Sequence, residues 1–431
     1  MKILIVNVHS NHNAGDAVLL AVAQQQLCEL FPGCQLTLAM NDPASASADE
    51  KVVSSFVPWF KRDGQWRRGS LLALPWFLLQ SLVALISYRL WRKGVWLGRR
   101  HGQSGARRAL LQAYFAADLV VSCPGNFLYS SGAIGLPLLL NFAAMIYGVL
   151  AGKPVYMLPQ TIGPLRRGWE FALLRWLLPR LRVVLLRDET SLALLQRAQI
   201  PTTNCHVVPD VAFLYAEGTA VKGTSVLQQL GIDRTTHGPL LGITMINWGA
   251  QNRTFAGQAA YEAAMAEAIP FFIQKYGGTV VLFSQVHGPT NAEDDRVPAR
   301  RVYERLEDYH EQVILVTEPL PPAQLQAAYG TMNLFIGTRL HSNIFALTQQ
   351  VPVLAIAYQY KTHGVMGLLG LGEWVLDIEG VQAAAVITEL QRLWTKRAAL
   401  RATLAQTLPR LQREIRTELL RIRHDYETVT K

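Results

Sequence analysis

The chain has 431 residues, half of them apolar, and a formal net charge of +10. This length exceeds one ordinary hydrophobic core and predicts two domains. The four cysteines form no C-x-x-C pair and no metal-ligand cluster, which excludes a disulfide-rich secreted scaffold and favours a reducing compartment.

The N-terminal half alternates short apolar strands with helical segments. Residues 1–9 predict a first strand rather than a signal peptide, because the apolar run is short and contains polar Asn7 and His9. We therefore expect the protein to stay in the cytoplasm. The pattern then predicts a helix over 17–31, a helix over 137–151, and strands over 35–40, 118–123, 153–158 and 183–186. Such alternation is typical of a parallel α/β sheet.

The strand ends in this half carry polar and glycine residues. The first strand leads into Asn13-Ala-Gly15-Asp16, a strand-to-helix loop whose backbone N–H groups offer an anion site. It is neither G-x-G-x-x-G nor a Walker loop, and Asp16 could simply be the N-cap. Arg187 precedes Asp188 and Glu189 at a helix start. The helix dipole explains the two acids but disfavours the arginine, so Arg187 is the better functional candidate.

A basic insertion interrupts the sheet. Residues 61–110 hold eleven Lys or Arg and one acid, so the rest of the chain is balanced. These charges flank an apolar segment over 71–88, and five of the ten Trp residues lie in or beside it. A nucleic-acid binder would spread its basic charge along a groove or a helix face. Trp, Lys and Arg around an apolar helix instead indicate an anchor on an anionic membrane surface.

The apolar segment is near the lower length limit for a transmembrane helix. A single crossing would separate residues 1–30 from residues 115–215, which belong to the same predicted sheet. We therefore expect a helix lying in the cytoplasmic leaflet, or a re-entrant hairpin broken near Pro75 or Gly94. The alternative is a cap whose apolar face packs on the protein body or on a second subunit, so an oligomer stays open.

A polar stretch over 216–238 with four glycines marks the domain boundary, and a second α/β unit follows. It has a helix over 256–276 and strands over 240–246, 279–284, 312–316, 332–336 and 353–358. From about residue 381 the chain is helical and charged, and we expect Pro409 to break it. The predicted division is an N-terminal lobe over 1–215 with an insertion at about 56–110, a C-terminal lobe over 216–385, and helices over 386–431 that pack across the lobes.

The segment Gly337-Thr-Arg339-Leu-His341 follows one apolar strand, and Lys361 follows the next. Ligands of open α/β sheets bind outside the carboxyl ends of the strands, so adjacent strand ends would bring these three side chains together. A guanidinium, an imidazole and an ammonium group suit a small anion that carries phosphate and carboxylate. The alternative is that Arg339 pairs with a carboxylate of the sheet and His341 caps the helix.

Together these segments resemble the polysaccharide pyruvyl transferase family. The resemblance covers most of the chain apart from the insertion and the C-terminal tail. Pro124 and Asn126 stand where the family more often has further glycines. The matching segments are Asn13-Ala-Gly15-Asp16, Cys-Pro-Gly125-Asn126, Pro-Gln160-Thr-Ile-Gly163-Pro164, Leu-Arg187-Asp188-Glu189-Thr-Ser191, Pro209-Asp210-Val-Ala-Phe213, Arg339-Leu-His341 and Tyr358-Gln-Tyr-Lys361.

The resemblance implies two Rossmann-like lobes, as in GT-B glycosyltransferases. It implies transfer of the pyruvyl group of phosphoenolpyruvate onto two hydroxyls of a sugar, with formation of a cyclic ketal and release of phosphate. The acceptor would be a polysaccharide precursor, which we expect to be lipid-linked. Phosphoenolpyruvate is then a co-substrate, and neither a cofactor nor a metal is implied.

Residue roles follow from this resemblance as hypotheses. Arg339 and Lys361 would hold the phosphate, and Arg187 the carboxylate or phosphate. His341 would be the general acid that protonates the methylene carbon, and Asp16 the base that accepts a proton from a sugar hydroxyl. The predicted contacts to the acceptor or to the loops are Asn13, Gly15, Gly125, Asn126 and Gln160.

Two other functions keep the same fold. One is a GT-B glycosyltransferase that uses a nucleotide sugar, since fold does not decide function. The other is a non-catalytic membrane scaffold of polysaccharide assembly. Three cations at one strand edge exceed what a nucleoside diphosphate needs, and an intact Arg, His and Lys set argues against a degenerate site.

Overall fold

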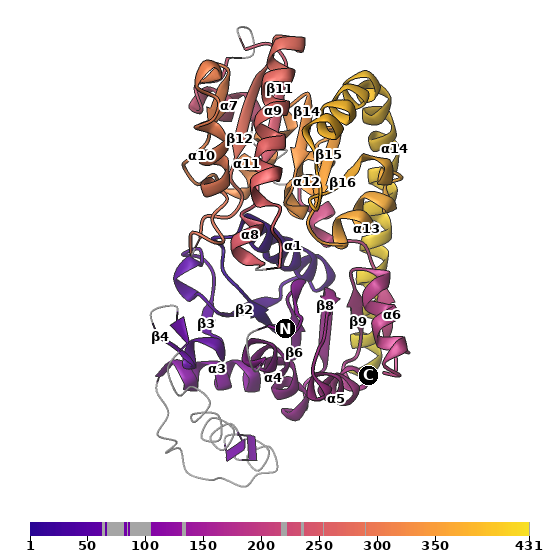
Figure 1. Ribbon diagram of the computed structural model, residues 1–431. Helices are drawn as coiled ribbons and strands as arrows, with labels where there is room; N and C mark the ends of the chain where they lie inside the picture. The colour runs from indigo at the N-terminus through magenta and orange to yellow at the C-terminus, as the bar shows by residue number, and fades with distance from the viewer. Residues whose placement is uncertain are drawn as a thin grey trace. The chain divides into compact units, whose positions relative to one another are not determined.

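The computed structural model describes residues 1–62, 65–66, 82–83, 85–86, 105–131, 135–216, 222–233, 237–252, 254–288 and 290–430. The chain forms two compact units. The first contains residues 1–11, 19–208 and 416–431, and the second contains residues 12–18 and 209–415. The predicted membrane anchor at about 56–110 lies largely outside the described residues. Figure 1 shows the strands and helices of both units in chain order.

The first unit is built on a parallel sheet. Its strand order is β10-β9-β8-β6-β1-β2-β3, and β7 pairs with β8. The six residues after Lys2 in β1 are all buried, as expected for a central strand covered on both faces. The strands are β1 (Lys2–Val8), β2 (Gln35–Met40), β3 (Val52–Ser54), β6 (Leu119–Ser122), β7 (Gly125–Leu128), β8 (Val155–Ile162), β9 (Val184–Leu186) and β10 (Cys205–Val207).

Helices cover this sheet. Helix α4 contacts β1, β6, β7 and β8, whereas α6 contacts β8, β9 and β10. Seven apolar side chains of α4 are buried in the hydrophobic core, so this helix contributes much of it. The helices are α1 (Ala14–Leu30), α3 (Gly105–Ala116), α4 (Leu136–Leu150), α5 (Gly168–Leu177) and α6 (Glu189–Arg197), and a two-stranded antiparallel pair joins β4 (Lys61–Arg62) to β5 (Gln65–Trp66).

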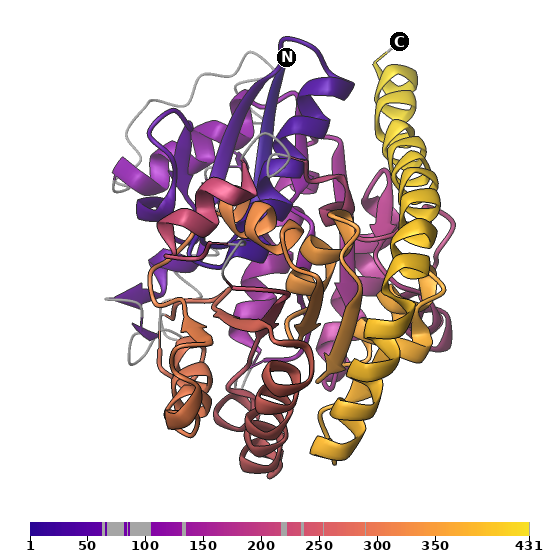
Figure 2. The same cartoon turned by 90° about the horizontal axis from the view of Figure 1, so that it is seen from above.

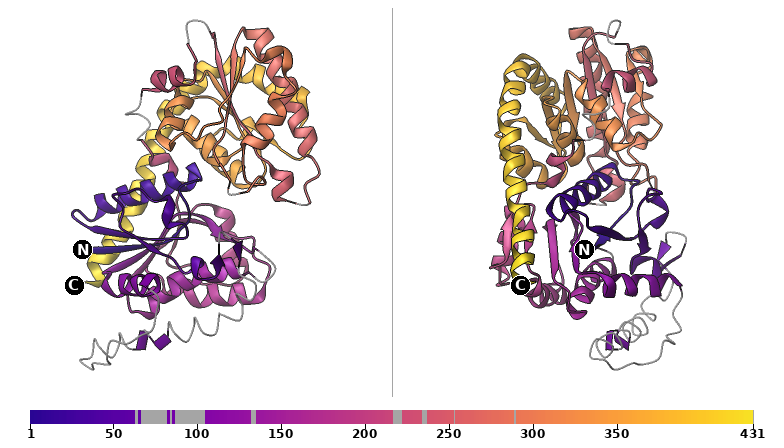
Figure 3. Two further views of the ribbon diagram at one scale, coloured as in Figure 1. Left: turned by 90° about the vertical axis from the view of Figure 1, so that its left-hand side faces the viewer. Right: turned by 180° about the vertical axis from the view of Figure 1, so that it is seen from behind.

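The second unit has a six-stranded parallel sheet of order β13-β12-β11-β14-β15-β16. Helices lie on both of its faces (Figure 3, left). The strands are β11 (Leu240–Thr244), β12 (Thr279–Phe283), β13 (Val313–Leu315), β14 (Leu334–Gly337), β15 (Val353–Ala357) and β16 (Val375–Asp377). The helical elements are η4 (Val211–Leu214), α7 (Gly223–Gln229), α8 (Trp248–Gln251), α9 (Gln258–Tyr276), α10 (Arg296–Tyr303), α11 (Pro322–Gly330), α12 (Leu340–Thr348), α13 (Lys361–Leu368) and α14 (Ala383–Val429). The part of α14 from Arg416 onward belongs to the first unit. Two parallel α/β sheets are thus confirmed.

Two local predictions are wrong. Pro409 does not break the C-terminal helix, because α14 continues through it (Figure 2). A proline removes one backbone N–H donor, and the buried Leu408 and Leu411 beside it offset that loss by packing. The segment from Gly125 was expected as a loop but forms β7, whose Phe127 and Leu128 are buried. Among the described residues, no helix is long and apolar enough to cross a membrane.

Candidate active site

Arg339 lies between β14 and α12, where it is the N-cap residue of the helix. Asp295 holds its guanidinium: Nε donates to Oδ1 at 3.0 Å, and Nη2 donates to the same oxygen at 2.6 Å. Nη2 also donates to the carbonyl of Glu293 at 3.2 Å. The Arg339 side chain is 14 % exposed, whereas that of Asp295 is fully buried. The anion that Arg339 meets in this structure is therefore a carboxylate of the chain itself.

The main chain fixes Asp295 in turn. Its Oδ2 accepts from the backbone N–H of Val286 at 3.0 Å and of Gln285 at 3.3 Å. Burial lowers the pKa of Arg339, but the charges and hydrogen bonds of Asp295 and Tyr358 together outweigh burial and raise that pKa above its usual value. The guanidinium is therefore charged and held rigidly at the carboxyl edge of the sheet.

Tyr358 and Lys361 follow β15, next to Arg339. The Lys361 Nζ lies 5.9 Å from the centre of the Tyr358 ring, and the Trp248 ring centre lies 4.8 Å from it. Burial raises the pKa of Tyr358, but the charges of Lys361 and Arg339 outweigh burial and lower it below its usual value. A phenol that ionises more easily despite burial indicates a positive field. This part of the edge favours an anion even though Arg339 is paired with Asp295.

His341 is the second residue of α12 and is partly buried, with 17 % of its side chain exposed. Its Nε2 lies 3.8 Å from Oδ2 of Asp210, which is fully buried. Gly15 lies against the same ring, since a Cβ on Gly15 would be 2.8 Å from Cγ of His341 and closer still to Nδ1. The imidazole is therefore enclosed by a carboxylate and by the backbone of the loop that follows β1.

That loop belongs to the second unit, whereas chain order had placed it in the first lobe. Asn13 forms an antiparallel bridge with Val286, and the Ala14 N–H donates to the carbonyl of Gln285 at 3.2 Å. Asn13 Oδ1 accepts from the N–H of Gly15 at 2.9 Å. Because α1 begins at Ala14, Asp16 lies in its first turn rather than at the N-cap.

The remaining predicted residues lie on the first sheet. Gly125 and Asn126 are in β7, where Gly125 is the register partner of Gln160 in β8. Arg187 follows β9 and is buried, and its Nε and Nη2 donate to Oγ1 of Thr161 at 3.1 and 3.0 Å. Gln160 is fully buried, yet neither polar atom of its amide has a hydrogen-bond partner among the described residues.

The structure thus sorts the predicted residues into two groups. Asn13, Gly15 and Asp16 share the second unit with Arg339, His341 and Lys361. Gly125, Asn126, Gln160 and Arg187 belong to the first unit. Within these groups, the Gly15 backbone is in contact with the His341 ring, and the Arg187 N–H donates to the carbonyl of Gln160 at 3.0 Å.

A comparison of the whole sequence with models of known protein families identifies the family. The family model described as "Polysaccharide pyruvyl transferase" matches residues 13–360. The chain belongs to the polysaccharide pyruvyl transferase family. Membership makes it a transferase. The match ends at Tyr360, so Lys361 lies just beyond it.

A relative agrees with this family, and solved structures agree with its fold. The chain is 25 % identical over 404 residues to "Amylovoran biosynthesis protein AmsJ" of Erwinia amylovora, and the match covers 90 % of this chain and 91 % of that protein. It resembles the UDP-GlcNAc 2-epimerase of Neisseria meningitidis with a TM-score of 0.57 at 12 % identity, covering 99 % of this chain and 100 % of the other. It resembles the glycosyltransferase SnogD of Streptomyces nogalater with a TM-score of 0.51 at 16 % identity, covering 100 % and 99 %. At this identity the likeness shows the fold alone, which is GT-B-like.

Sequence reasoning missed two acidic residues of this pyruvyl transferase. Asp295 pairs with Arg339 across 44 positions of sequence, and no local pattern connects them. Asp210 was part of a motif, but nothing in the motif showed that its carboxylate lies beside His341. A buried glutamine was also missed: Gln285 is 2 % exposed, and neither atom of its side-chain amide has a hydrogen-bond partner in the described part of the chain.

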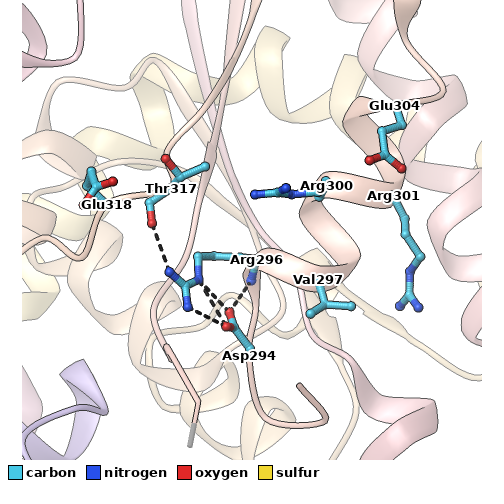
Figure 4. A pocket seen from close by; sticks show the side chains of 8 residues that line it. All are labelled: Asp294, Arg296, Val297, Arg300, Arg301, Glu304, Thr317 and Glu318. Carbon is cyan, nitrogen blue, oxygen red and sulfur yellow. Dashed lines mark hydrogen bonds and ion pairs between the residues drawn. The ribbon is translucent and has the colours of Figure 1, made fainter. Parts of the chain in front are cut away.

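A pocket of about 620 Å³ opens beside this site, along α10 (Figure 4). Arg296 donates to both carboxylate oxygens of Asp294 and to the carbonyl of Thr317 there. Three arginines and three acids line it, so its formal charges balance and it does not select an anion. Its lining residues are Asp294, Arg296, Val297, Arg300, Arg301, Glu304, Thr317 and Glu318. In the described residues, no group of three or more His, Cys, Asp or Glu side chains could hold a metal ion.

Proposed function

We propose that this transferase moves the pyruvyl group of phosphoenolpyruvate onto two hydroxyls of a sugar, forms a cyclic ketal and releases phosphate. The observation that carries the proposal is the family match over residues 13–360. The positive field around Tyr358 supports it, because phosphoenolpyruvate carries a phosphate and a carboxylate on a three-carbon skeleton.

The proposed donor-binding residues are Arg339, His341 and Lys361 in the second unit and Arg187 in the first. Asp295 occupies Nε and Nη2 of Arg339, and Tyr358 is also hydrogen-bonded to this guanidinium, so Arg339 would act on the phosphate chiefly through its charge. Lys361 would supply the mobile charge, since an ammonium on a flexible stem adapts to a phosphate oxygen. Arg187 would bind the carboxylate or phosphate from the first unit.

The chemistry needs one acid and one base. His341 would protonate the methylene carbon of phosphoenolpyruvate, which makes C2 cationic and open to a sugar hydroxyl. Asp16 would take the proton of that hydroxyl. A second hydroxyl of the same sugar then attacks C2 as the C–O bond to phosphate breaks, and its proton leaves with the phosphate, which closes the ketal. Asn13, Gly15, Gly125, Asn126 and Gln160 are the proposed contacts to the acceptor or to the loops that hold it.

The donor assignment can be tested by calorimetric titration of phosphoenolpyruvate. We expect micromolar to millimolar binding to the wild type and a loss of about tenfold or more in Lys361→Met, which corresponds to about 1.4 kcal/mol. Lys396→Met is the matched control, because Lys396 pairs only loosely with exposed Glu373 at 3.9 Å. Arg339→Ala is a poorer probe, since it also leaves buried Asp295 unpaired.

Turnover separates this function from its two alternatives. Phosphate release from phosphoenolpyruvate in the presence of a lipid-linked saccharide would exclude a non-catalytic scaffold. If the wild type neither binds phosphoenolpyruvate nor releases phosphate with the acceptor present, but binds a nucleotide sugar, glycosyl transfer replaces pyruvyl transfer.

We further propose that the acceptor is an exopolysaccharide precursor on a lipid carrier and that the protein is peripheral on the inner face of the cytoplasmic membrane. The relative named for amylovoran biosynthesis supports the first part. The apolar segment flanked by basic residues supports the second, because an anchored enzyme meets a lipid-linked acceptor at raised local concentration.

Vesicle sedimentation tests the anchor. The wild type should pellet with anionic vesicles, and charged substitutions at Trp76, Leu79 and Val83 should weaken pelleting. Val429→Glu is the control, because Val429 is an exposed apolar residue far along the chain from the insertion. A wild type that stays in the supernatant with vesicles in excess would contradict the anchor.

A further inference from the structure

The imidazole of His341 is confined by two elements that the proposed mechanism does not use for it. Asp210 lies at the start of η4, and α12 packs on η4. Gly15 lies in the first turn of α1 and is in contact with the ring. Neither contact was indicated by the sequence.

We propose that Asp210 is a positioning residue for His341, and that Gly15 forms the opposite wall that holds the imidazole in place. The inference rests on the proposed function, in which His341 is the proton donor. Its geometric basis is the 3.8 Å separation between Nε2 and Oδ2 of Asp210, together with the close approach of the Gly15 backbone.

Asp210 is built to hold a fixed carboxylate. It is fully buried, and its Oδ1 accepts from the N–H of Ala212 at 2.9 Å. That hydrogen bond orients Oδ2 toward His341. A separation of 3.8 Å is an ion-pair distance rather than a hydrogen bond, and catalytic contacts often shorten when substrate binds. A buried carboxylate at this distance stabilises the protonated imidazole, which is the form that a general acid needs.

Gly15 is required for close approach. A Cβ would lie within 2.8 Å of the ring carbon Cγ, a distance that real Cβ atoms essentially never show. The loop cannot easily move away, because the Ala14 N–H is bonded to the carbonyl of Gln285 and Asn13 bridges Val286. An alanine at position 15 would therefore displace the imidazole from Asp210 rather than displace the loop.

A double-mutant cycle tests whether Asp210 acts through His341. Asp210→Asn keeps an oxygen for the Ala212 N–H and removes only the charge beside the ring. We expect kcat to fall about tenfold or more, while KM for phosphoenolpyruvate stays within about twofold. In the His341→Gln background, Asp210→Asn should cause no further loss of kcat. Independent losses that multiply, or an unchanged kcat in Asp210→Asn, would overturn the proposal.

Gly15→Ala provides the second arm, with Gly168→Ala as its matched control. Both glycines lie in the first turn of a helix, but a Cβ on Gly168 would meet nothing within 4 Å. We expect Gly15→Ala to lose kcat about as strongly as Asp210→Asn, and Gly168→Ala to match the wild type. Thermal melting of each variant checks that the fold is kept.

A measurement without substrate separates this inference from the proposed function. The ring ¹⁵N resonances of His341, assigned with His341→Gln, should shift toward the neutral form in Asp210→Asn and move in Gly15→Ala but not in Gly168→Ala. If the wild type transfers no pyruvyl group, the proposed function fails while these shifts still support the positioning of His341. Identical His341 resonances in wild type and Asp210→Asn would reject the positioning role whether or not the enzyme is active.

Discussion

Two largely buried polar side chains near the carboxyl ends of strands, Arg339 in the second unit and Gln160 in the first, differ in whether they have partners, and Gln285 in the second unit resembles Gln160. In the second unit, the charge of Arg339 is met by Asp295, which is itself bound by two backbone N–H groups. In the first unit, the amide of fully buried Gln160 has no hydrogen-bond partner among the described residues. An unsatisfied buried group costs about 1–3 kcal/mol and needs an explanation, of which an absent ligand is one. The difference predicts that breaking the Arg339 pair lowers stability, whereas replacing Gln160 removes an amide that we propose contacts substrate.

We expect the largest loss of stability when the ion pair between Arg339 and Asp295 is broken. Asp295→Asn leaves the Arg339 guanidinium without its counter-charge in a buried place. Removing one partner of a buried ion pair lowers the free energy of unfolding by about 3–5 kcal/mol. Chemical denaturation should show this loss in the absence of any substrate.

Asp294→Asn is the matched control for that prediction, because it changes the neighbouring residue in the same way. Its partner Arg296 is 36 % exposed, so the pair is partly screened by water. We expect a loss of about 1 kcal/mol or less. Equal losses in Asp294→Asn and Asp295→Asn would show that the Arg339 pair is no more structural than a surface pair.

The sequence predicts which residues lie at the carboxyl edge of the second unit's sheet, but it does not predict which groups they contact. Strand ends can be located from apolar runs, so Arg339, His341 and Lys361 were expected to lie at a sheet edge. Whether a guanidinium there meets a ligand or a carboxylate depends on long-range packing. The loop that ends with Asp295 is brought to Arg339 by the fold, and no periodicity marks that contact.

The fold itself was easier to predict than the site. Strand β2 was predicted with its bounds, Gln35–Met40, because Leu36, Leu38 and Met40 alternate along the run with the two-residue period of a strand. The three-residue strands Val52–Ser54 and Val375–Asp377 were missed, whereas the equally short Val184–Leu186 was predicted, because its residues, which are buried in the structure, are all apolar. The start of α1 was placed three residues late, and its grouping with the second unit depends on contacts that lie far along the chain.

A second prediction contrasts two fully buried glutamines. Gln326 donates to the carbonyl of Tyr215 at 3.0 Å and to Oγ1 of Thr348 at 2.9 Å, so its amide is satisfied. Gln326→Met should lower the free energy of unfolding by about 1–3 kcal/mol. Gln160→Met, which has nothing to lose in the absence of substrate, should change it by less than about 1 kcal/mol.

Turnover should rank the same two variants in the opposite order. Gln160→Met should lower kcat/KM for pyruvyl transfer, because the amide that would contact substrate is gone. Gln326→Met should keep kcat/KM at temperatures where it stays folded. A Gln160→Met variant that is as destabilised as Gln326→Met would mean that Gln160 is structural, and the contrast between the two sheet edges would disappear.

The smallest expected change in stability concerns Glu170. It tests whether buried polar groups without partners in the first unit are confined to the edge where Gln160 lies. Glu170, in the same unit, is fully buried and well satisfied: it accepts from the N–H groups of Arg166 and Arg167 at 2.9 and 3.0 Å and from the Ser130 hydroxyl. Burial raises the pKa of Glu170, but these hydrogen bonds outweigh burial and lower the pKa below its usual 4.5.

A lowered folded-state pKa means that the carboxylate stabilises the protein above about pH 4.5 and that this contribution is lost as the pH falls through the lower folded value. The difference in free energy of unfolding between wild type and Glu170→Gln should therefore be about 1–2 kcal/mol at pH 7 and should shrink toward pH 3. Glu427→Gln, at an exposed i,i+4 pair with Arg423, should differ from wild type by about 0.5 kcal/mol or less at every pH.

If wild type and Glu170→Gln lose stability in parallel as the pH falls, Glu170 is not held as a carboxylate. The first unit would then lack a satisfied counterpart to Gln160, and the contrast would be one between whole units rather than between two sheet edges.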